Sequence, residues 1–542
     1  MSTTYKVVVA DAISRAGLAP LAGDSRFEIV ERVGLAGEAL GDALADADAV
    51  LVRSTARITR DVLERTHRLK VIGRAGVGVD TIDVDAATER GVAVLTAPSG
   101  NTISAAELTI ALILSLARRI AAADRSMKSG AWDRKSFDGV ELHGKTLGLI
   151  GAGRIGSEVA RRARAFGMRV LAYDPHIPEE HARALEIELL PLEDVLRAAD
   201  VVSLHVPLTE GTSGLLGEKR LRSMKRGAFL VNAARGGVVD ERALVAVLRD
   251  GHLGGAALDV FETEPLPSDH PLRALDTVVL TPHLGASTPE AQHLVAIEIA
   301  EAVRQALVEG DLSRAVNAPA IAGEEMRRAR PMLDLAERLG RLASVLMDAP
   351  LRRVEVRYAG SVPNVLSTLA ASAMVGILSH AVGRATVNLV SALHLAKSRG
   401  IEVVRVGLPV KSDYAEYVEL SLSSGGAPLD VAGAVIGSGH SRVVRLGRFH
   451  VDIIPAGSLV ILRNRDVPGV IGRVGTLLGN ASVNIGEYHQ SRLAAGGEAL
   501  AAISVDGRLG PELVTALRQL PEVIDVRQVE LDTPGNMAVR RG

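Results

Sequence analysis

The stretch LGLIGAGRIGSEVARRARAFGMRVLAYDP, residues 147–175, decides the fold class of the chain. An apolar run leads into Gly151, Gly153 and Gly156, a helix-like segment follows, and a second apolar run ends at Asp174. Glycines at this spacing allow a tight turn, a close approach of backbone to a pyrophosphate, and close packing of helix on strand. A carboxylate after the second strand accepts hydrogen bonds from ribose hydroxyls and repels a 2′-phosphate. The stretch therefore predicts a turn that binds NAD rather than NADP; the alternative is a glycine-rich turn without a ligand.

Bulk composition narrows the class of protein. A chain of 542 residues is too long for one hydrophobic core, so several domains are expected. Its 62 Lys and Arg against 64 Asp and Glu give a net charge of −2, which predicts neither a nucleic-acid partner nor a membrane partner. The sequence has no cysteine, which excludes disulfides, thiolate nucleophiles and cysteine-ligated zinc, and we expect no metal site. The first residues, MSTTYKVVVAD, lack a signal-peptide pattern, and the apolar run 108–117 is too short for a bilayer, so we expect a cytoplasmic protein.

Strand-like and helix-like segments alternate through the first part of the chain. Short β-branched runs separated by Ala- and Leu-rich segments are typical of parallel sheets with crossover helices. Long helices are predicted over 101–123 and 288–310, and because they bracket the second unit, the chain is expected to return afterwards to the first domain. The predicted domains are 1–100 together with 287–318, and 101–286.

The rest of the chain is predicted to hold two smaller domains and a tail. Residues 319–457 mix helical segments with strand patterns at 352–360, 417–424 and 449–455, without a catalytic motif. Residues 458–531 follow the order β-α-β-β-α-β, and the polar tail 532–542 is expected to be frayed. The predicted fold class is α/β: two doubly wound parallel-sheet domains, Rossmann-like, followed by an α+β domain and a βαββαβ domain.

Three polar residues come directly after strand-like runs, where ligands of open α/β sheets collect. They are Arg235 in VNAARGG, Glu264 in DVFETEP and His283 in LTPHLG. Hydride transfer from a secondary alcohol needs a base for the hydroxyl proton and a cation that holds the substrate. A neutral histidine is a suitable base near pH 7, and a neighbouring carboxylate fixes its tautomer. From these residues alone, a structural role for any one of them stays open.

The stretches GAGRIG, HVPLT, NAARGG, ALDVFETEP and TPHLGAST, in this order, resemble the D-2-hydroxyacid dehydrogenase family over residues 1 to about 316. The resemblance implies that His283 is the acid/base, that Glu264 is its partner, and that Arg235 binds the carboxylate and carbonyl of the substrate. It also implies NAD as the cofactor, and alanine stands at position 233 where the family often has cysteine. The positions it assigns to the cofactor are Gly151, Gly153, Arg154, Ile155, Gly156, Asp174, Pro207, Ala233, Asp259 and Gly285.

The segments VRSTARIT and IGRAGVGVDTID resemble the 3-phosphoglycerate dehydrogenase branch of that family. A substrate with a phosphate and a carboxylate needs several cations, and guanidinium groups match phosphate geometry. The branch places its substrate site at Arg53, Arg74, Val77, Gly78 and Asn101, and at Arg134 and Lys135, of which the arginine is expected to reach in from a neighbouring subunit. The expected substrate is 3-phosphoglycerate. Solvated surface arginines, another 2-hydroxyacid such as glyoxylate or lactate, and an NAD-sensing corepressor are the alternatives.

The last predicted domain resembles an ACT domain, a small-molecule-sensing module, in its strand order and in RDVPGVIGRVGTLLGNASVNIG. In the branch this module binds L-serine across a dimer, at positions that correspond to Asn464, Asp466 and Asn484. The resemblance further implies a homotetramer. A module that only dimerises is the alternative.

Residues 319–457 resemble the intervening domain of the longer form in this branch. Within them, GHSRVVRLGRFH brings His440, Arg442, Arg445 and Arg448 close in sequence. The interpretation is either an anion site or a solvated basic surface.

Overall fold

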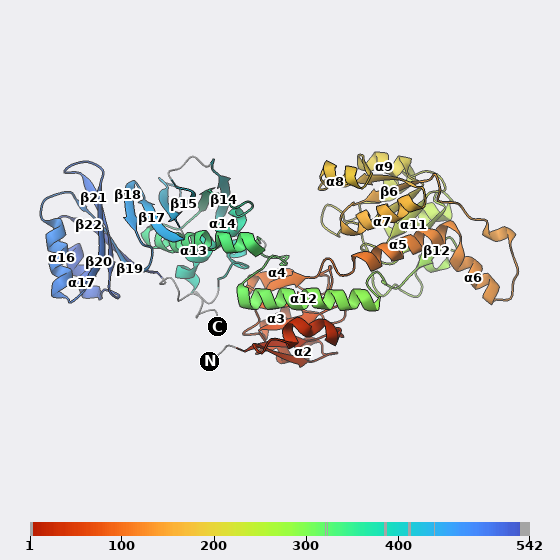
Figure 1. Ribbon diagram of the computed structural model, residues 1–542, viewed down its shortest axis with the longest axis horizontal. Coiled ribbons are helices and arrows are strands. Elements are labelled where there is room, and N and C mark those ends of the chain that lie inside the picture. Colours follow the sequence, from red (N-terminus) through yellow and green to blue (C-terminus); the bar gives the residue numbers. More distant parts are fainter. Residues whose placement is uncertain are drawn as a thin grey trace.

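The computed structural model describes residues 4–531, apart from 320, 322, 384–386, 410–413 and 438. The predicted frayed tail, 532–542, lies outside the described residues. The described residues build four sheets, and Figure 1 shows the first sheet and its helices between the second sheet on one side and the two C-terminal sheets on the other. This agrees with the predicted fold class.

The first sheet has the order β2-β1-β3-β4-β5, and all its pairings are parallel. Its strands β3, β4 and β5 are buried on both faces and therefore read as nearly continuous apolar runs, whereas the edge strand β2 is only partly buried. The strands are β1 (Tyr5–Val9), β2 (Phe27–Glu31), β3 (Ala49–Val52), β4 (Val71–Arg74) and β5 (Ala93–Thr96). The connecting helices are η1 (Arg15–Leu18), α1 (Ala19–Ala22), α2 (Gly37–Leu44), α3 (Arg60–Glu64) and α4 (Val84–Glu89).

The second sheet is parallel, with the order β12-β11-β10-β9-β6-β7-β8. The strand order reverses between β6 and β9, and the carboxyl ends at such a reversal form the usual ligand crevice. The strands are β6 (Thr146–Ile150), β7 (Arg169–Tyr173), β8 (Glu188–Leu189), β9 (Val201–Leu204), β10 (Phe229–Asn232), β11 (Gly255–Leu258) and β12 (Val278–Leu280). The helices are α7 (Arg154–Ala165), α8 (Glu179–Ala184), α9 (Leu192–Ala198), α10 (Glu218–Ser223), α11 (Glu241–Arg249) and η3 (Pro271–Ala274).

Two long segments connect the first two sheets. The helix predicted over 101–123 is wrong in its extent, because Arg119 takes a left-handed backbone (φ 52°) and divides it into α5 (Thr102–Ala117) and α6 (Ile120–Lys128). The Arg119 side chain stacks over Phe137 of η2 (Lys135–Phe137) at 5.6 Å, a tertiary contact that helix periodicity does not reveal. Helix α12 (Pro289–Glu309) then carries the chain back and packs its buried face on the core of the first sheet.

The third sheet is mixed, with the order β14-β13-β15-β16-β17-β18. Helices α13 (Gly323–Leu346) and α14 (Leu366–Val382) cover one of its faces and cross closely at two glycines. A Cβ at Gly376 would lie 1.9 Å from the carbonyl oxygen of Glu337, and one at Gly340 would lie 2.2 Å from that of Ala373. The other elements are β13 (Arg353–Ala359), α15 (Ala392–Ser398), β14 (Glu402–Gly407), β15 (Glu416–Ser423), β16 (Leu429–Ile436), β17 (His440–Leu446) and β18 (Phe449–Ile453).

The fourth sheet is antiparallel, with the order β20-β21-β19-β22, and its elements follow the predicted β-α-β-β-α-β order. The face that α16 and α17 leave open contributes Leu459, Ile461 and Leu500 to the same hydrophobic core as α13. The third and fourth sheets are therefore parts of one packed body. The elements are β19 (Gly457–Arg465), α16 (Val470–Asn480), β20 (Ile485–Arg492), β21 (Glu498–Val505), α17 (Pro511–Arg518) and β22 (Val523–Leu531).

Within the described residues, no helix combines the length and the apolar character that a bilayer crossing requires.

The close crossing of α13 and α14 gives a stability prediction. Gly376→Ala places a Cβ against the backbone of α13, so the helices must separate, and we expect a loss of about 2 kcal/mol in the free energy of unfolding. Gly475→Ala in α16 is the matched control, because its Cβ meets nothing within 4 Å and alanine favours the helix by about 0.5–1 kcal/mol. Urea denaturation measures both. Equal effects of the two changes would contradict the packing described here.

A second prediction concerns acid stability. Burial lowers the pKa of His205, just after β9, to about 4. The unfolded chain takes up this proton near pH 6.5, so stability is complete above that pH and falls by about 3 kcal/mol as the pH drops towards 4. We expect His205→Gln to flatten the dependence of the urea midpoint on pH between 6.5 and 4. The exposed His67, changed to Gln, is the control, and an unchanged profile in His205→Gln would refute this assignment.

Candidate active site

The turn between β6 and α7 has the shape that a dinucleotide needs. Gly151 has a left-handed backbone (φ 95°), and a Cβ there would lie 2.6 Å from the carbonyl oxygen of His205. A Cβ at Gly156 would lie 2.3 Å from the Gly151 carbonyl oxygen, so α7 approaches the turn closely. Gly153 has no atom within 4 Å of its Cβ position, which leaves open space in front of the first N–H groups of α7. A pyrophosphate fits this place, because the helix N-terminus favours anions.

Asp174 lies beside this turn with its carboxylate already oriented. Its Oδ2 accepts a hydrogen bond from Ala152 N at 2.8 Å, and its Oδ1 accepts one from His176 N at 2.8 Å. Ribose hydroxyls can use the remaining lone pairs, and the charge repels a 2′-phosphate. The adjoining pocket of about 470 Å³ is lined by Thr102, Ala152, Gly153, Arg154, Ser157, Glu158, Asp174, His176, Ile177 and His181.

Other residues predicted to contact the cofactor lie around the same strand ends. Pro207 is exposed just beyond β9, and Ala233 follows β10 directly. Ile155 packs partly against the core of the second sheet. The pocket residues that were not predicted are Thr102, Ala152, Ser157, Glu158, His176, Ile177 and His181. The position of Ala152 inside the glycine motif, and that of His176 and Ile177 just after Asp174, are the signals that could have indicated three of them.

His283 and Glu264 form a hydrogen-bonded pair at the carboxyl edge of the second sheet. His283 Nδ1 lies 2.8 Å from Glu264 Oε2, and Glu264 Oε1 accepts a hydrogen bond from Phe261 N at 3.1 Å. Burial raises the pKa of Glu264, but its hydrogen bonds to His283 and Phe261 outweigh this and hold the pKa below its usual value. Glu264 is therefore a carboxylate that keeps the proton of a neutral His283 on Nδ1 and leaves Nε2 to act as a base.

Asp259 holds the loop that carries His283. His283 has a left-handed backbone (φ 55°), an unfavourable conformation for a residue with a side chain. The buried carboxylate of Asp259 accepts hydrogen bonds from Thr281 Oγ1 (2.6 Å), Leu284 N (2.7 Å) and Gly285 N (3.0 Å). These bonds fix the loop on both sides of His283. Asp259 and Gly285, predicted to line the cofactor, thus share a network beside His283.

Arg235 extends from the loop after β10 towards the first sheet. Asn232 shapes this loop, since its Nδ2 donates to Arg235 O at 2.9 Å and its Oδ1 accepts from Ala234 N at 3.1 Å. The guanidinium forms an ion pair with Asp80, with 3.6 Å between Nε and Oδ2. Asp80 follows β4, so this pair joins the two parallel-sheet domains.

Two further arginines of the predicted substrate site lie on the first sheet beside Arg235. Arg74 ends β4, and burial together with the charge of Arg235 lowers its pKa to about 10. Its Nη1 donates to Ala75 O at 2.9 Å, while its buried Nε–H has no hydrogen-bond partner in the described part of the chain. Arg53 follows β3, and its charge also lowers the pKa of Arg74. Arg53, Arg74 and Arg235 thus form one cationic cluster between the two parallel-sheet domains, named the recess, in which the Nε–H of Arg74 is an unused donor.

Asp11, which sequence reasoning missed, supports the loop of Arg53. Its carboxylate is 4% exposed and accepts hydrogen bonds from Arg53 N (2.6 Å), Thr55 N (3.2 Å) and Ala56 N (3.0 Å). The only available signal was its place at the end of the first strand-like run.

The remaining predicted substrate residues lie at three places in the chain. Val77 and Gly78 lie in the loop after β4, and a Cβ at Gly78 would lie 2.3 Å from Arg235 Nη2. Asn101 precedes α5, and its buried Oδ1 has no partner among the described residues. Arg134 and Lys135 are exposed in the segment after α6, which in Figure 1 projects from the far end of the second domain. One chain therefore does not bring them to the recess.

The predicted effector residues also separate within one chain. Asn464 and Asp466 lie at the end of β19, where Asn464 pairs with Ala499 of β21. Asn484 precedes β20 and hydrogen-bonds to Asp506, just beyond Val505 at the opposite end of β21. Six residues of a strand span about 20 Å, so a small amino acid cannot touch both groups in one copy.

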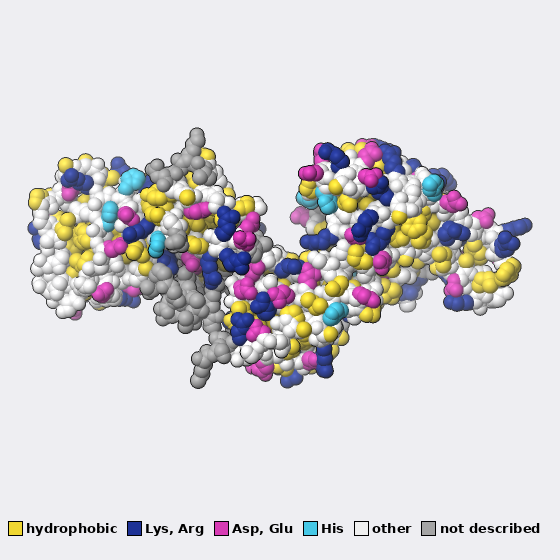
Figure 2. Space-filling view, viewed as in Figure 1, with side chains coloured by type: hydrophobic (Ala, Val, Ile, Leu, Met, Phe, Trp, Pro, Cys, Tyr) yellow, Lys and Arg dark blue, Asp and Glu magenta, His cyan; other side chains and the backbone are white. Residues whose placement is uncertain are grey.

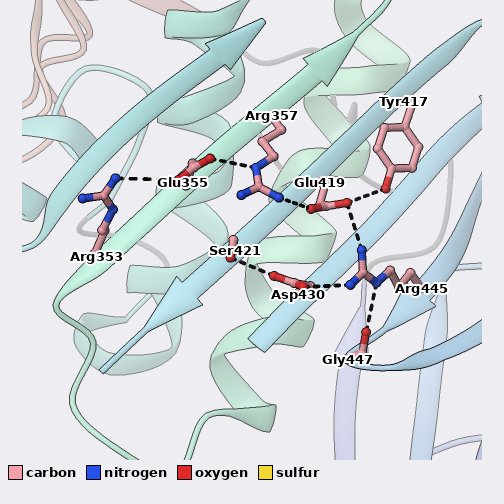
Figure 3. A network of polar contacts seen from close by, with 9 residues as sticks. All are labelled: Arg353, Glu355, Arg357, Tyr417, Glu419, Ser421, Asp430, Arg445 and Gly447. Carbon is pink, nitrogen blue, oxygen red and sulfur yellow. Dashed lines mark hydrogen bonds and ion pairs between the residues drawn. The ribbon is translucent and has the colours of Figure 1, made fainter. Parts of the chain in front are cut away.

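The basic cluster in 439–450 is largely neutralised. Figure 3 shows Arg445 between Glu419 and Asp430, and Arg357 between Glu355 and Glu419, on one face of the third sheet. Arg442 is paired with Asp452 at 3.3 Å and with Glu487 of the fourth sheet at 3.3 Å. On the face seen in Figure 2, positive and negative side chains are interspersed. These contacts favour a surface of ion pairs over an anion site.

Comparison with protein families agrees with this geometry. Residues 110–285 match the NAD-binding domain of D-isomer specific 2-hydroxyacid dehydrogenases. Residues 328–447 match the intervening domain of D-3-phosphoglycerate dehydrogenase. The first match contains the glycine turn and His283, so the chain has an NAD-binding domain.

Among solved structures, similarity covers the two parallel-sheet domains. A glyoxylate reductase from Paecilomyes thermophila has a TM-score of 0.54 at 31% identity, over 58% of this chain and 99% of that one. An NAD-dependent formate dehydrogenase from Staphylococcus aureus, in complex with NAD, has a TM-score of 0.50 at 30% identity, over 55% of this chain and 95% of that one.

Curated relatives match nearly the whole chain. The D-3-phosphoglycerate dehydrogenase of Bacillus subtilis is 41% identical over 528 residues, which cover 97% of this chain and 100% of the relative. The D-3-phosphoglycerate dehydrogenase of Methanocaldococcus jannaschii is 40% identical over 528 residues, which also cover 97% of this chain and 100% of the relative. With both family matches inside this alignment, the chain belongs to the D-3-phosphoglycerate dehydrogenases of the D-isomer specific 2-hydroxyacid dehydrogenase family.

Proposed function

We propose that the chain oxidises 3-phospho-D-glycerate to 3-phosphohydroxypyruvate with NAD. The observation that carries this proposal is that Arg53, Arg74 and Arg235 lie close enough for their charges to interact, with Arg235 also close to Glu264 of the His283–Glu264 pair. The buried Nε–H of Arg74 is an unused donor, and a buried donor without a partner favours binding of an acceptor such as an anion. A substrate with both a phosphate and a carboxylate supplies enough negative charge for the three guanidinium groups, whereas a simple hydroxyacid needs one.

We assign a different role to each of these residues. Arg235 holds the carboxylate, and Arg53 and Arg74 hold the phosphate, as bidentate geometry allows. His283 Nε2 takes the hydroxyl proton, and Glu264 stabilises the imidazolium that forms. Gly151, Gly153 and Asp174 hold NAD, which when bound is the hydride acceptor. The hydroxyl oxygen of the substrate loses the proton and the carbon that bears it loses the hydride, so that these two atoms become the carbonyl of the ketone.

Self-association is part of the proposal. The segment from α6 to residue 142 exposes Ile120, Met127, Trp132 and Val140, with Trp132 80% exposed. Figure 2 shows apolar side chains on this projection. Exposed apolar patches mark interaction sites, and we propose a second copy as the occupant. Arg134 and Lys135, on the same projection, would then reach the recess of that copy.

We further propose that L-serine is an effector that binds at the fourth sheet. We also propose that the chain forms a homotetramer, with contacts between copies at both the projection and this sheet. The separation of Asp466 from Asn484 supports a serine site between two copies. A cytoplasmic location stays a prediction.

His283→Ala tests the proposed chemistry. Loss of the base should lower kcat for 3-phosphoglycerate oxidation by about 10²–10⁴-fold. The dissociation constant of NADH should change less than about 3-fold, because His283 lies outside the pocket of Asp174. NADH formation measures turnover, and NADH fluorescence measures binding; exposed His67→Ala is the control. A fully active His283→Ala enzyme would refute the assignment, and a wild-type chain that turns over only glyoxylate or lactate would refute the substrate.

Hybrid enzymes test the shared serine site. Asp466→Ala and Asn484→Ala should each abolish inhibition by serine without lowering uninhibited turnover. In a hybrid of the two, one of the two sites in each symmetric pair combines Asp466 of one copy with Asn484 of the other and is intact. Co-expression with two affinity tags should therefore restore partial inhibition. Hybrids that remain insensitive, when the wild type is inhibited, would contradict a site between copies.

A further inference from the structure

Asp80 is a carboxylate among the arginines of the recess that the proposed chemistry leaves without a role. It lies in the loop after β4, on the first sheet, and reaches Arg235, which belongs to the loop after β10 on the second sheet. The ion pair has 3.6 Å between Asp80 Oδ2 and Arg235 Nε. The Asp80 side chain is 66% exposed and that of Arg235 is 25% exposed. The Asp80 end of the pair is therefore open to solvent, and the Arg235 end is partly buried.

The Arg235 guanidinium is held on two sides. Its Nη1 donates to its neighbour's carbonyl, Ala234 O, at 2.6 Å, and its Nε faces Asp80. Its Nη2 lies against the backbone of Gly78, where a Cβ would be 2.3 Å away. Rotation about the last bonds of the side chain would break the contact with Asp80 or with Ala234. The plane of the guanidinium is thus set before any substrate arrives.

The charges around Arg74 and Arg235 also support a positioning role for Asp80. Arg53 and Arg235 both disfavour the charged form of Arg74, whereas Asp80 and Asp11 favour it. Without Asp80, the like charge of Arg74 would push the Arg235 guanidinium towards solvent. Asp11 cannot replace it, because its oxygens already accept N–H groups of the Arg53 loop.

We propose that Asp80 is a positioning residue that holds the Arg235 guanidinium in the orientation that receives the carboxylate of the substrate. The proposal rests on the proposed function, since it assigns Arg235 to that carboxylate. A half-exposed ion pair contributes little to folding stability. Misplacing a substrate-binding group by about 1 Å, in contrast, can cost up to about 10²-fold in rate. The effect should therefore appear in catalysis and not in folding.

Asp80→Ala in the full chain is the first test, with 3-phosphoglycerate and NAD as the probes. We expect kcat/KM for 3-phosphoglycerate to fall about 10-fold, mainly through KM, while KM for NAD changes less than about 2-fold. Asp80→Glu should recover most of the loss, because it restores the carboxylate. Asp85→Ala, at an exposed carboxylate in the first turn of α4, removes the same charge nearby and should leave both KM values unchanged.

The Arg235→Lys background separates positioning from general electrostatics. Lysine lacks the Nε–H and the planar fork, so Asp80→Ala should change KM for 3-phosphoglycerate by less than about 2-fold there. The same 10-fold loss in both backgrounds would overturn the proposal. A lower KM in Asp80→Ala would also overturn it, since it would show that Asp80 only repels the substrate. If the wild type oxidises 3-phosphoglycerate and Asp80→Ala equals it, this inference alone fails; a wild type without that activity contradicts the proposed function itself.

Discussion

Three guanidinium groups share one recess, and the structure must hold them there against their mutual repulsion. The means are buried or oriented carboxylates: Asp11 fixes the loop of Arg53, and Asp80 faces Arg235. Arg74 shows the strain that remains, since burial and the charge of Arg235 lower its pKa to about 10. A dianionic or trianionic substrate relieves this repulsion on binding. The repulsion among the three arginines therefore explains both the free-energy cost of the site and its preference for a phosphorylated acid.

The parallel sheets make this concentration of charge possible. In each sheet the strands run the same way, so their carboxyl ends lie at one edge and the loops beyond them converge. Arg53 and Arg74 come from one such edge, and Arg235 and His283 come from the other. Helices α5 and α12 connect the two domains. Chemistry thus takes place between two rigid units, with each functional side chain only a few residues from a buried strand.

Much of the site could be predicted because its signals are local. The glycine turn, Asp174 and the polar residues after strands are each readable within a few positions of a strand-like run. The place of Asp11 after a strand-like run did not reveal its role, and neither did the position of Asp80, because both roles depend on contacts with residues more than 40 positions away. The helix break at Arg119 likewise accompanies a contact with Phe137 that lies outside the helical pattern. Strand β16 escaped prediction because Gly433 must admit Leu335 of α13, and small residues weaken the strand pattern.

The most direct test of the account compares 3-phosphoglycerate with D-glycerate, which has the same carbon skeleton without the phosphate, by following the absorbance of NADH. If Arg53 and Arg74 hold the phosphate, kcat/KM for 3-phosphoglycerate should exceed that for D-glycerate by at least about 10²-fold, as expected when two charge-assisted contacts are lost. Equal values of kcat/KM for the two acids would show that the arginines do not bind the phosphate, and would contradict the central claim.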